Sequence, residues 1–217
     1  MLKHGLMPLF PLSPHPSSVK EEGVKLPLCV SPMNNKKPTI LATTLIARTR
    51  LFAVEEVHLR FSNGVEMRYE RLLGSPYGAV LLVALNAADE VLLVREYAVG
   101  LHRYELGLPK GGMEADETPL QAGLRELREE TGFGARRMDA LGELTLAPGY
   151  SSQRTHVVLA RDLYPAPLEG DEPEPLEVVP WPLARLHELI AMPECSEART
   201  LAAMFMAREF MANELCE

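Results

Sequence analysis

Residues 111–133 constrain the fold of this chain more than any other segment, because they predict one helix with both of its ends marked. Thr118 supplies a hydroxyl group for the N-cap, Pro119 stands at the first helical position, and Gln121 completes a capping box. Gly132 is suited to end the helix, because glycine readily adopts the left-handed conformation of a C-cap. We therefore expect a helix between Thr118 and Gly132.

The predicted helix separates apolar and acidic side chains. At about 100° per residue, an apolar stripe that must pack on a sheet or another helix consists of Leu120, Leu124, Leu127 and Thr131. Three glutamates lie on a different face and are spatial neighbours, namely Glu126, Glu129 and Glu130. Gly123 in mid-helix indicates close packing on a sheet, since alanine would otherwise be more stable there by about 1 kcal/mol.

The three glutamates predict a metal site, because adjacent carboxylates repel one another and a bound divalent cation removes that conflict. All-oxygen ligands favour a hard ion such as Mg²⁺, with Mn²⁺ as a substitute, over zinc. Arg125 is placed to reach back to Glu117 and to brace the loop before the helix. The alternative interpretation is a solvated acidic helix face that holds no metal.

Composition and charge limit the possible partners. A net charge of −8 argues against a general surface for nucleic acid or anionic membrane, whereas a small anionic substrate is compatible with a bound metal. No apolar run approaches the ~20 residues that a membrane span needs. The three cysteines, Cys29, Cys195 and Cys216, contain no CxxC pair and indicate reduced thiols, so we expect a cytoplasmic protein.

The chain is predicted to consist of a flexible extension, residues 1–37, and one domain, residues 38–217. Repeated prolines without periodicity mark the extension, and Met33 is an alternative start. Residues 38–72 predict antiparallel strands with a hairpin at 62–64. Further strands are expected at 79–85 and 90–99, and helices at 182–192 and 197–215. This order predicts an α+β fold, an α/β/α sandwich with a mixed sheet.

The spacing within residues 111–133 resembles the Nudix box, because it matches G-x5-E-x7-R-E-U-x-E-E-x-G-U at every fixed position, where U is aliphatic or aromatic. Segments such as REYAVG, YELGLPKG and WPLARL extend the resemblance to bacterial Nudix hydrolases that act on ADP compounds. It implies a Nudix fold and Mg²⁺-dependent hydrolysis of the diphosphate linkage in ADP-ribose, NADH or diadenosine polyphosphates, which releases AMP or ADP. It also implies a homodimer that residues 38–72 join.

The resemblance further implies roles for particular residues. The catalytic residues would be Glu129, Glu172 and Arg125, with either glutamate as the general base. The metal ligands would be Gly111, Glu126, Glu129, Glu130 and Glu174. The substrate contacts would be Arg95, Lys110, Tyr150 and Arg154.

Several alternatives stay open at this level. Tyr150 would stack on adenine or is an ordinary strand-edge tyrosine, and Lys110 would meet a phosphate or is a surface lysine. Ala98 stands where some ADP-ribose hydrolases carry an arginine, which favours a broader substrate range. The alternative function is a module that senses ADP-ribose-like nucleotides without turnover, although every glutamate of the box is present. The net charge disfavours a hydrolase of capped RNA 5′ ends.

Overall fold

The computed structural model describes residues 36–214, so the predicted extension, residues 1–37, lies almost wholly outside the described residues. The described chain begins with a three-stranded antiparallel sheet in the order β1–β2–β3. Its strands are β1 (Thr39–Arg48), β2 (Ala53–Arg60) and β3 (Glu66–Leu72). Gly64 has a φ of 84° in the turn between β2 and β3, where the sequence predicts a hairpin.

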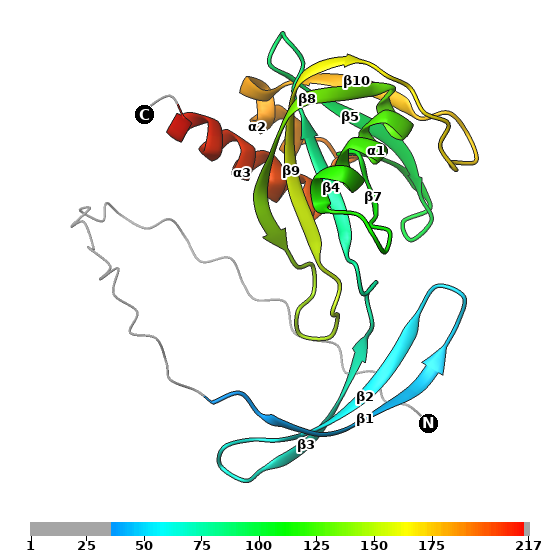
Figure 1. Cartoon of the computed structure of the whole chain (residues 1–217), viewed down its shortest axis with the longest axis vertical. Helices are drawn as coiled ribbons and strands as arrows, with labels where there is room; N and C mark the ends of the chain where they lie inside the picture. Colours follow the sequence, from blue (N-terminus) through cyan, green and yellow to red (C-terminus); the bar gives the residue numbers. More distant parts are fainter. Residues whose placement is uncertain (1–35, 215–217) are drawn as a thin grey trace, which may run out of the picture. The chain divides into compact units, whose positions relative to one another are not determined.

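The later strands form two more sheets (Figure 1). The sheet β7–β4–β9–β8 is mixed, because β4 runs parallel to β9 while the other neighbours are antiparallel. The sheet β10–β5–β6 is antiparallel throughout. The strands are β4 (Ala79–Ala84), β5 (Glu90–Ala98), β6 (Arg103–Gly107), β7 (Lys110–Gly112), β8 (Phe133–Leu144), β9 (Thr155–Pro165) and β10 (Glu177–Pro182).

The helices follow the order that the sequence predicts, but the helix expected over 182–192 is shorter than predicted. They are α1 (Pro119–Thr131), α2 (Leu186–Ile190) and α3 (Ala198–Glu214), and a 3₁₀ turn, η1 (Leu183–Arg185), precedes α2. The helix predicted over 182–192 is shorter because the chain up to Pro182 pairs with β5 as strand β10. None of the helices in residues 36–214 combines the length and apolar character that a membrane crossing requires.

Strand β4 lies at the centre of the core, because both of its faces are buried. One face packs in a cluster with side chains of α1, and it carries Val80, Leu82 and Ala84. The other face packs in a cluster with side chains of α3, and it carries Leu81 and Val83. Burial on both faces explains why β4 is a continuous apolar run. Helices α1 and α3 therefore cover opposite faces of the mixed sheet (Figure 1), which confirms the predicted α/β/α sandwich.

Helix α1 packs closely on the sheet through a glycine. A Cβ atom at Gly123 would lie 3.2 Å from the Leu82 side chain, so the structure bears out the close packing that the sequence indicates. The predicted apolar stripe is partly wrong, because Leu120 is 38% exposed. The close approach at Gly123 turns the face that carries Ala122 and Glu126 inward, and Leu120 lies outside that face.

Candidate active site

Local interactions fix both ends of α1 and thereby the direction of its glutamates. The Thr118 hydroxyl accepts a hydrogen bond from the Gln121 backbone N–H, and the Gln121 side chain accepts one from the Thr118 N–H, which confirms the capping box. Gly132 has a φ of 77° and its N–H donates to the Arg128 carbonyl, which confirms the left-handed C-cap. Between these caps the three glutamates face strand β7 and the loop before β10.

Strand β7 lies directly against the first glutamate of the cluster. A Cβ atom at Gly111 would lie 2.0 Å from the carboxyl carbon of Glu126, so a side chain cannot be added while that carboxylate keeps its place. At the neighbouring Gly112, a Cβ atom would meet nothing within 4 Å. The glycine at the start of the box is therefore required for a close approach between backbone and carboxylate.

Arg125 joins the acidic residues of the box. Its guanidinium donates two hydrogen bonds to Glu117, of 2.8 and 2.9 Å, in the bidentate arrangement that the sequence predicts. It also donates to Glu126 (2.7 Å), to Glu129 (3.0 Å) and to the Gly112 carbonyl (2.9 Å). The hydrogen bonds that Arg125 donates to Glu117 raise the pKa of the guanidinium, which therefore stays a cation. One arginine thus holds the loop, β7 and the helix together.

Burial raises the pKa of two of the carboxyl groups in the cluster. Glu126 is 8% exposed, and desolvation raises its pKa although Arg125 lies beside it. Burial raises the pKa of Glu130 to about 8, and the Lys110 backbone N–H donates to this carboxyl group at 3.2 Å. Ionised carboxylates in such surroundings are stabilised by a nearby cation.

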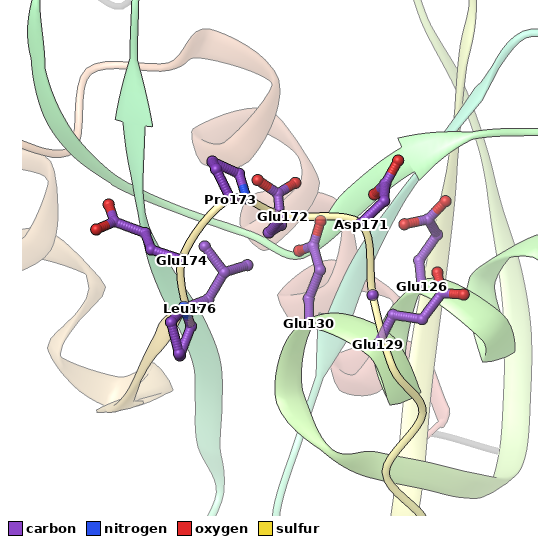
Figure 2. A pocket seen from close by; sticks show the side chains of 10 residues that line it. Glu126, Glu129, Glu130, Asp171, Glu172, Pro173, Glu174 and Leu176 are labelled. Carbon is purple, nitrogen blue, oxygen red and sulfur yellow. The ribbon is translucent and has the colours of Figure 1, made fainter.

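A second acidic segment, the loop of residues 168–176, faces the helix. Together the loop and the helix enclose a pocket of ≈ 250 Å³ (Figure 2), lined by Glu126, Glu129, Glu130 and residues 170–176. Glu172 and Glu130 both line this pocket, whereas in Figure 2 Glu174 points away from the helix glutamates. The pocket therefore brings together carboxylates that are more than 40 residues apart in the sequence.

Hydrogen bonds hold this loop at both of its ends. On the side of α1, the Arg128 side chain donates to the Ala166 carbonyl (2.9 Å) and the Leu168 N–H donates to the Arg128 carbonyl (3.2 Å). On the side of β6, the Tyr104 hydroxyl donates to the Glu174 carboxylate at 2.5 Å. The predicted metal ligand Glu174 is thus bonded to a tyrosine.

The surroundings of the pocket change the pKa of the loop carboxylate Glu172. Desolvation raises its pKa, with smaller contributions from Glu96 and Asp171, while Lys110 lowers it. The Lys110 ammonium forms an ion pair with Glu96, so this predicted substrate contact lies at the edge of the cluster. A carboxylate with a raised pKa is suited to accept a proton near neutral pH.

The donor chemistry of the cluster fits a hard divalent cation. Its donor atoms are carboxylate oxygens. Their total negative charge is larger than the single positive charge that the Arg125 guanidinium contributes. Within residues 36–214, no three acidic, histidine or cysteine side chains are already arranged around one ion position, since Glu126 and Glu129 turn toward Arg125. The residues present are therefore compatible with Mg²⁺, while their arrangement here is held by the arginine.

None of the four predicted substrate contacts lines this pocket; Lys110 lies at its edge, and the other three lie elsewhere. The Arg95 guanidinium pairs with Glu177 (2.8 Å) and Glu194 (2.6 Å), which ties β5 to β10 and to the segment before α3. Tyr150 is 60% exposed and lines a different cavity beside β3. Arg154 lines a third cavity. Their assignment as substrate contacts stays a prediction for a state that includes substrate or a second subunit.

Three residues at the pocket were not among the predicted site residues. The charges of Glu96 and Asp171 raise the pKa of Glu172, and the Tyr104 hydroxyl donates a hydrogen bond to Glu174. A partial signal existed for Asp171, which belongs to the acidic run of the loop. Glu96 and Tyr104 carried no such signal, because their partners are distant in the sequence.

Comparisons with known proteins agree with this geometry. Residues 38–71 match the NudE-type Nudix hydrolase N-terminal domain, and residues 76–204 match the NUDIX domain. The chain is 48% identical to the ADP compounds hydrolase NudE of Escherichia coli (strain K12), over 82% of this chain and 96% of that protein. It is 30% identical to an ADP-ribose pyrophosphatase of Bacillus subtilis (strain 168), over 73% of this chain and 89% of that protein.

A solved structure shows the same fold. The crystal structure of an ADP compounds hydrolase matches with a TM-score of 0.78 and 47% sequence identity, over 83% of this chain and 97% of that chain. The two domain matches, the extent of the relatives and the shared fold lead to one conclusion. The chain belongs to the Nudix hydrolase family and carries a NudE-type N-terminal domain.

Proposed function

We propose that this chain hydrolyses the diphosphate linkage of ADP compounds such as ADP-ribose, NADH and diadenosine polyphosphates, and releases AMP or ADP. The observation that carries the proposal is the pocket in which the glutamates of α1 face the acidic loop. Similarity to an ADP compounds hydrolase and to an ADP-ribose pyrophosphatase supports the substrate class. The buried thiol Cys195 agrees with the cytoplasmic location that we propose.

Glu126, Glu129 and Glu130, with the Gly111 carbonyl, would hold Mg²⁺ or Mn²⁺, and we keep Glu174 as a further candidate. When bound, such an ion neutralises the diphosphate oxygens and lowers the pKa of a bound water. The Arg125 guanidinium would keep the carboxylates of the box in place.

Glu172 is our candidate for the general base. Its carboxyl group borders the pocket, and its raised pKa suits a group that takes a proton from water and later releases it. Glu129 is the competing candidate, but its carboxylate accepts a hydrogen bond from Arg125 at 3.0 Å, so that oxygen is already engaged. The choice between these two glutamates is a prediction with its own test.

A substrate panel tests the proposed function. Purified protein with Mg²⁺ is expected to convert ADP-ribose to AMP and ribose 5-phosphate, and NADH to AMP and reduced nicotinamide mononucleotide. Products separated by ion exchange, with diadenosine triphosphate and a nucleoside triphosphate included, would define the range. Nucleotide binding with no turnover on any ADP compound would instead favour the sensing module.

Replacing Gly111 by alanine is expected to lower kcat by about a hundredfold, since an ångström-scale displacement of a catalytic group has effects of this size. The new methyl group would occupy the position of the Glu126 carboxylate, which must move. Gly112→Ala is the matched control, because its methyl group would meet nothing within 4 Å. Equal activity of the two variants would contradict the structural role of Gly111.

We also propose that the β1–β3 sheet joins two copies of the chain. Every residue of β1 is exposed, including Leu45, which is 52% exposed, and such apolar surface is typical of an interface. Sedimentation equilibrium is expected to give twice the mass of one chain. Leu45→Asp should shift this equilibrium toward single chains, whereas Asn63→Asp, the same change in charge at the β2–β3 turn, should not. A single-chain mass for the wild type would exclude the dimer.

A further inference from the structure

A further cavity, of ≈ 580 Å³, includes Lys110, which contacts Glu130 of the acidic cluster, in its lining. It is formed by the β5–β6 hairpin, residue 110 of β7 and the start of α3. Its lining is largely apolar and includes Val94, Ala98, Val99, Leu101 and Leu146. Val99 is 82% exposed and Leu101 is 58% exposed, so the cavity presents apolar surface that a bound group would cover. Cavities of ~300–1,000 Å³ with such linings are typical of small-molecule sites.

Residues that line the apolar cavity also contact the acidic cluster and its loop. The Lys110 backbone N–H donates to Glu130 in the acidic cluster, while its ammonium pairs with Glu96, which lines the apolar cavity. The Tyr97 ring, also in that lining, packs edge-on against Tyr104 at 5.6 Å, and Tyr104 holds the acidic loop. The apolar cavity is therefore linked to the acidic cluster through Lys110, and to the acidic loop through the Tyr97–Tyr104 pair.

The charges in the lining indicate which kind of group would enter. Three carboxylates, Glu96, Glu105 and Glu197, line the cavity, and each is paired with a cation, namely Lys110, Arg103 and Arg199 respectively. The start of α3 attracts no anion here, because the Glu197 carboxylate already accepts the Thr200 N–H at 2.7 Å. A phosphate would have to compete with these carboxylates for cations that they already hold. A neutral ring with N–H donors would match both the apolar surface and the carboxylate acceptors.

We propose that this cavity binds a heteroaromatic ring of the substrate that carries an exocyclic amine or amide. The inference rests on the proposed function and adds to it a binding site for one end of the molecule. Two rings have this chemistry, namely adenine and the reduced nicotinamide of NADH. In either case the ring fixes the diphosphate at the carboxylate cluster without taking part in the reaction.

Filling the cavity tests the proposal. Ala98→Trp should raise KM by about tenfold, as is typical when an apolar pocket loses its fit, with kcat changed little. Leu101→Glu, which adds a fourth carboxylate, is the second variant and should act in the same direction if the tryptophan variant does not fold. Gly100→Ser is the control on the same hairpin, because Gly100 does not line the cavity and has open space around it.

Comparison of two substrates identifies the ring. If adenine occupies the cavity, KM rises alike for ADP-ribose and NADH; if nicotinamide does, KM rises for NADH alone. Unchanged KM values in both folded variants would overturn the proposal while wild-type turnover still upheld the proposed function. A change in oligomer mass with unchanged KM would also overturn it, since a second chain would then cover the cavity. If the wild type hydrolyses neither substrate, fluorescence titration of NADH into these variants tests the cavity separately.

Discussion

Glu130→Gln is expected to abolish measurable turnover, with a fall in kcat of several orders of magnitude, and at the same time to stabilise the metal-free protein. Glu130 is a proposed metal ligand, and the uncharged amide would hold Mg²⁺ poorly. The same carboxyl group disfavours folding, because burial raises its pKa to about 8 and its ionised form is poorly solvated. A glutamine has nearly the same shape and can still accept the Lys110 N–H hydrogen bond.

The stabilisation has a defined pH dependence. The pKa of Glu130 rises from the ordinary value of 4.5 to about 8 on folding, so the unfolded chain releases this proton first. The carboxyl group therefore costs the folded state nothing at low pH. Its cost grows above the unfolded pKa and is complete once the pH exceeds about 8. The Tm advantage of Glu130→Gln should widen from acidic to mildly alkaline pH and then level off.

Calorimetry without metal and kinetics with saturating Mg²⁺ check both halves of this prediction. A Tm increase of a few degrees corresponds to roughly 1 kcal/mol in a domain of this size. Glu209→Gln is the control, because Glu209 is an exposed helical glutamate of α3 and both measurements should stay at wild-type values. Near-normal turnover of Glu130→Gln would show that Glu130 is not a required metal ligand. A lower Tm of this variant would show that the charge of Glu130 stabilises the fold.

The parts of this structure that the sequence predicts correctly depend on short-range interactions. The capping box of α1 involves Thr118 and Gln121, three residues apart, and the bracing of Arg125 on Glu117 spans eight residues. Residue type and spacing determine such contacts almost by themselves. The apolar run of β4 is similarly direct, because a strand buried on both faces admits few polar side chains.

The parts that the sequence does not predict depend on tertiary neighbours. Arg95 pairs with Glu177 and Glu194, which are 82 and 99 residues away, and its side chain is held by them in this structure. Tyr150 and Arg154, which follow the box in the sequence, line other cavities in this structure, and their role as substrate contacts stays a prediction. Periodicity on one helix cannot reveal such placements, since it carries no information on the partner element.

Because helix periodicity carries no information on the partner element, it also predicts the buried face of α1 partly wrongly. A stripe of large apolar residues predicts the buried side of an isolated helix, so Leu120 was assigned to it. In the structure, Gly123 lets α1 approach the sheet, and Glu126 turns inward to meet Gly111. A buried carboxylate at a glycine is a property of a functional site that amphipathic patterns do not encode.

Glu172→Gln is expected to lower kcat by at least about a hundredfold while leaving KM nearly unchanged, which is the range for loss of a general base. The amide keeps the size of the side chain but cannot accept a proton. Glu172 has a pKa raised by desolvation and by the neighbouring charges of Glu96 and Asp171. Glu169→Gln is the control, because Glu169 is an exposed acid of the same segment that does not line the pocket.

The pH profile separates Glu172 from Glu129 as the base. A base must be deprotonated to act, so kcat of the wild type should fall as the pH drops through the pKa of Glu172, at a pH above the ordinary 4.5. In Glu172→Gln this acidic limb should disappear from the residual rate. An unchanged rate and profile would assign the base to Glu129, and the hydrogen bond from Arg125 would then have to break during each turnover.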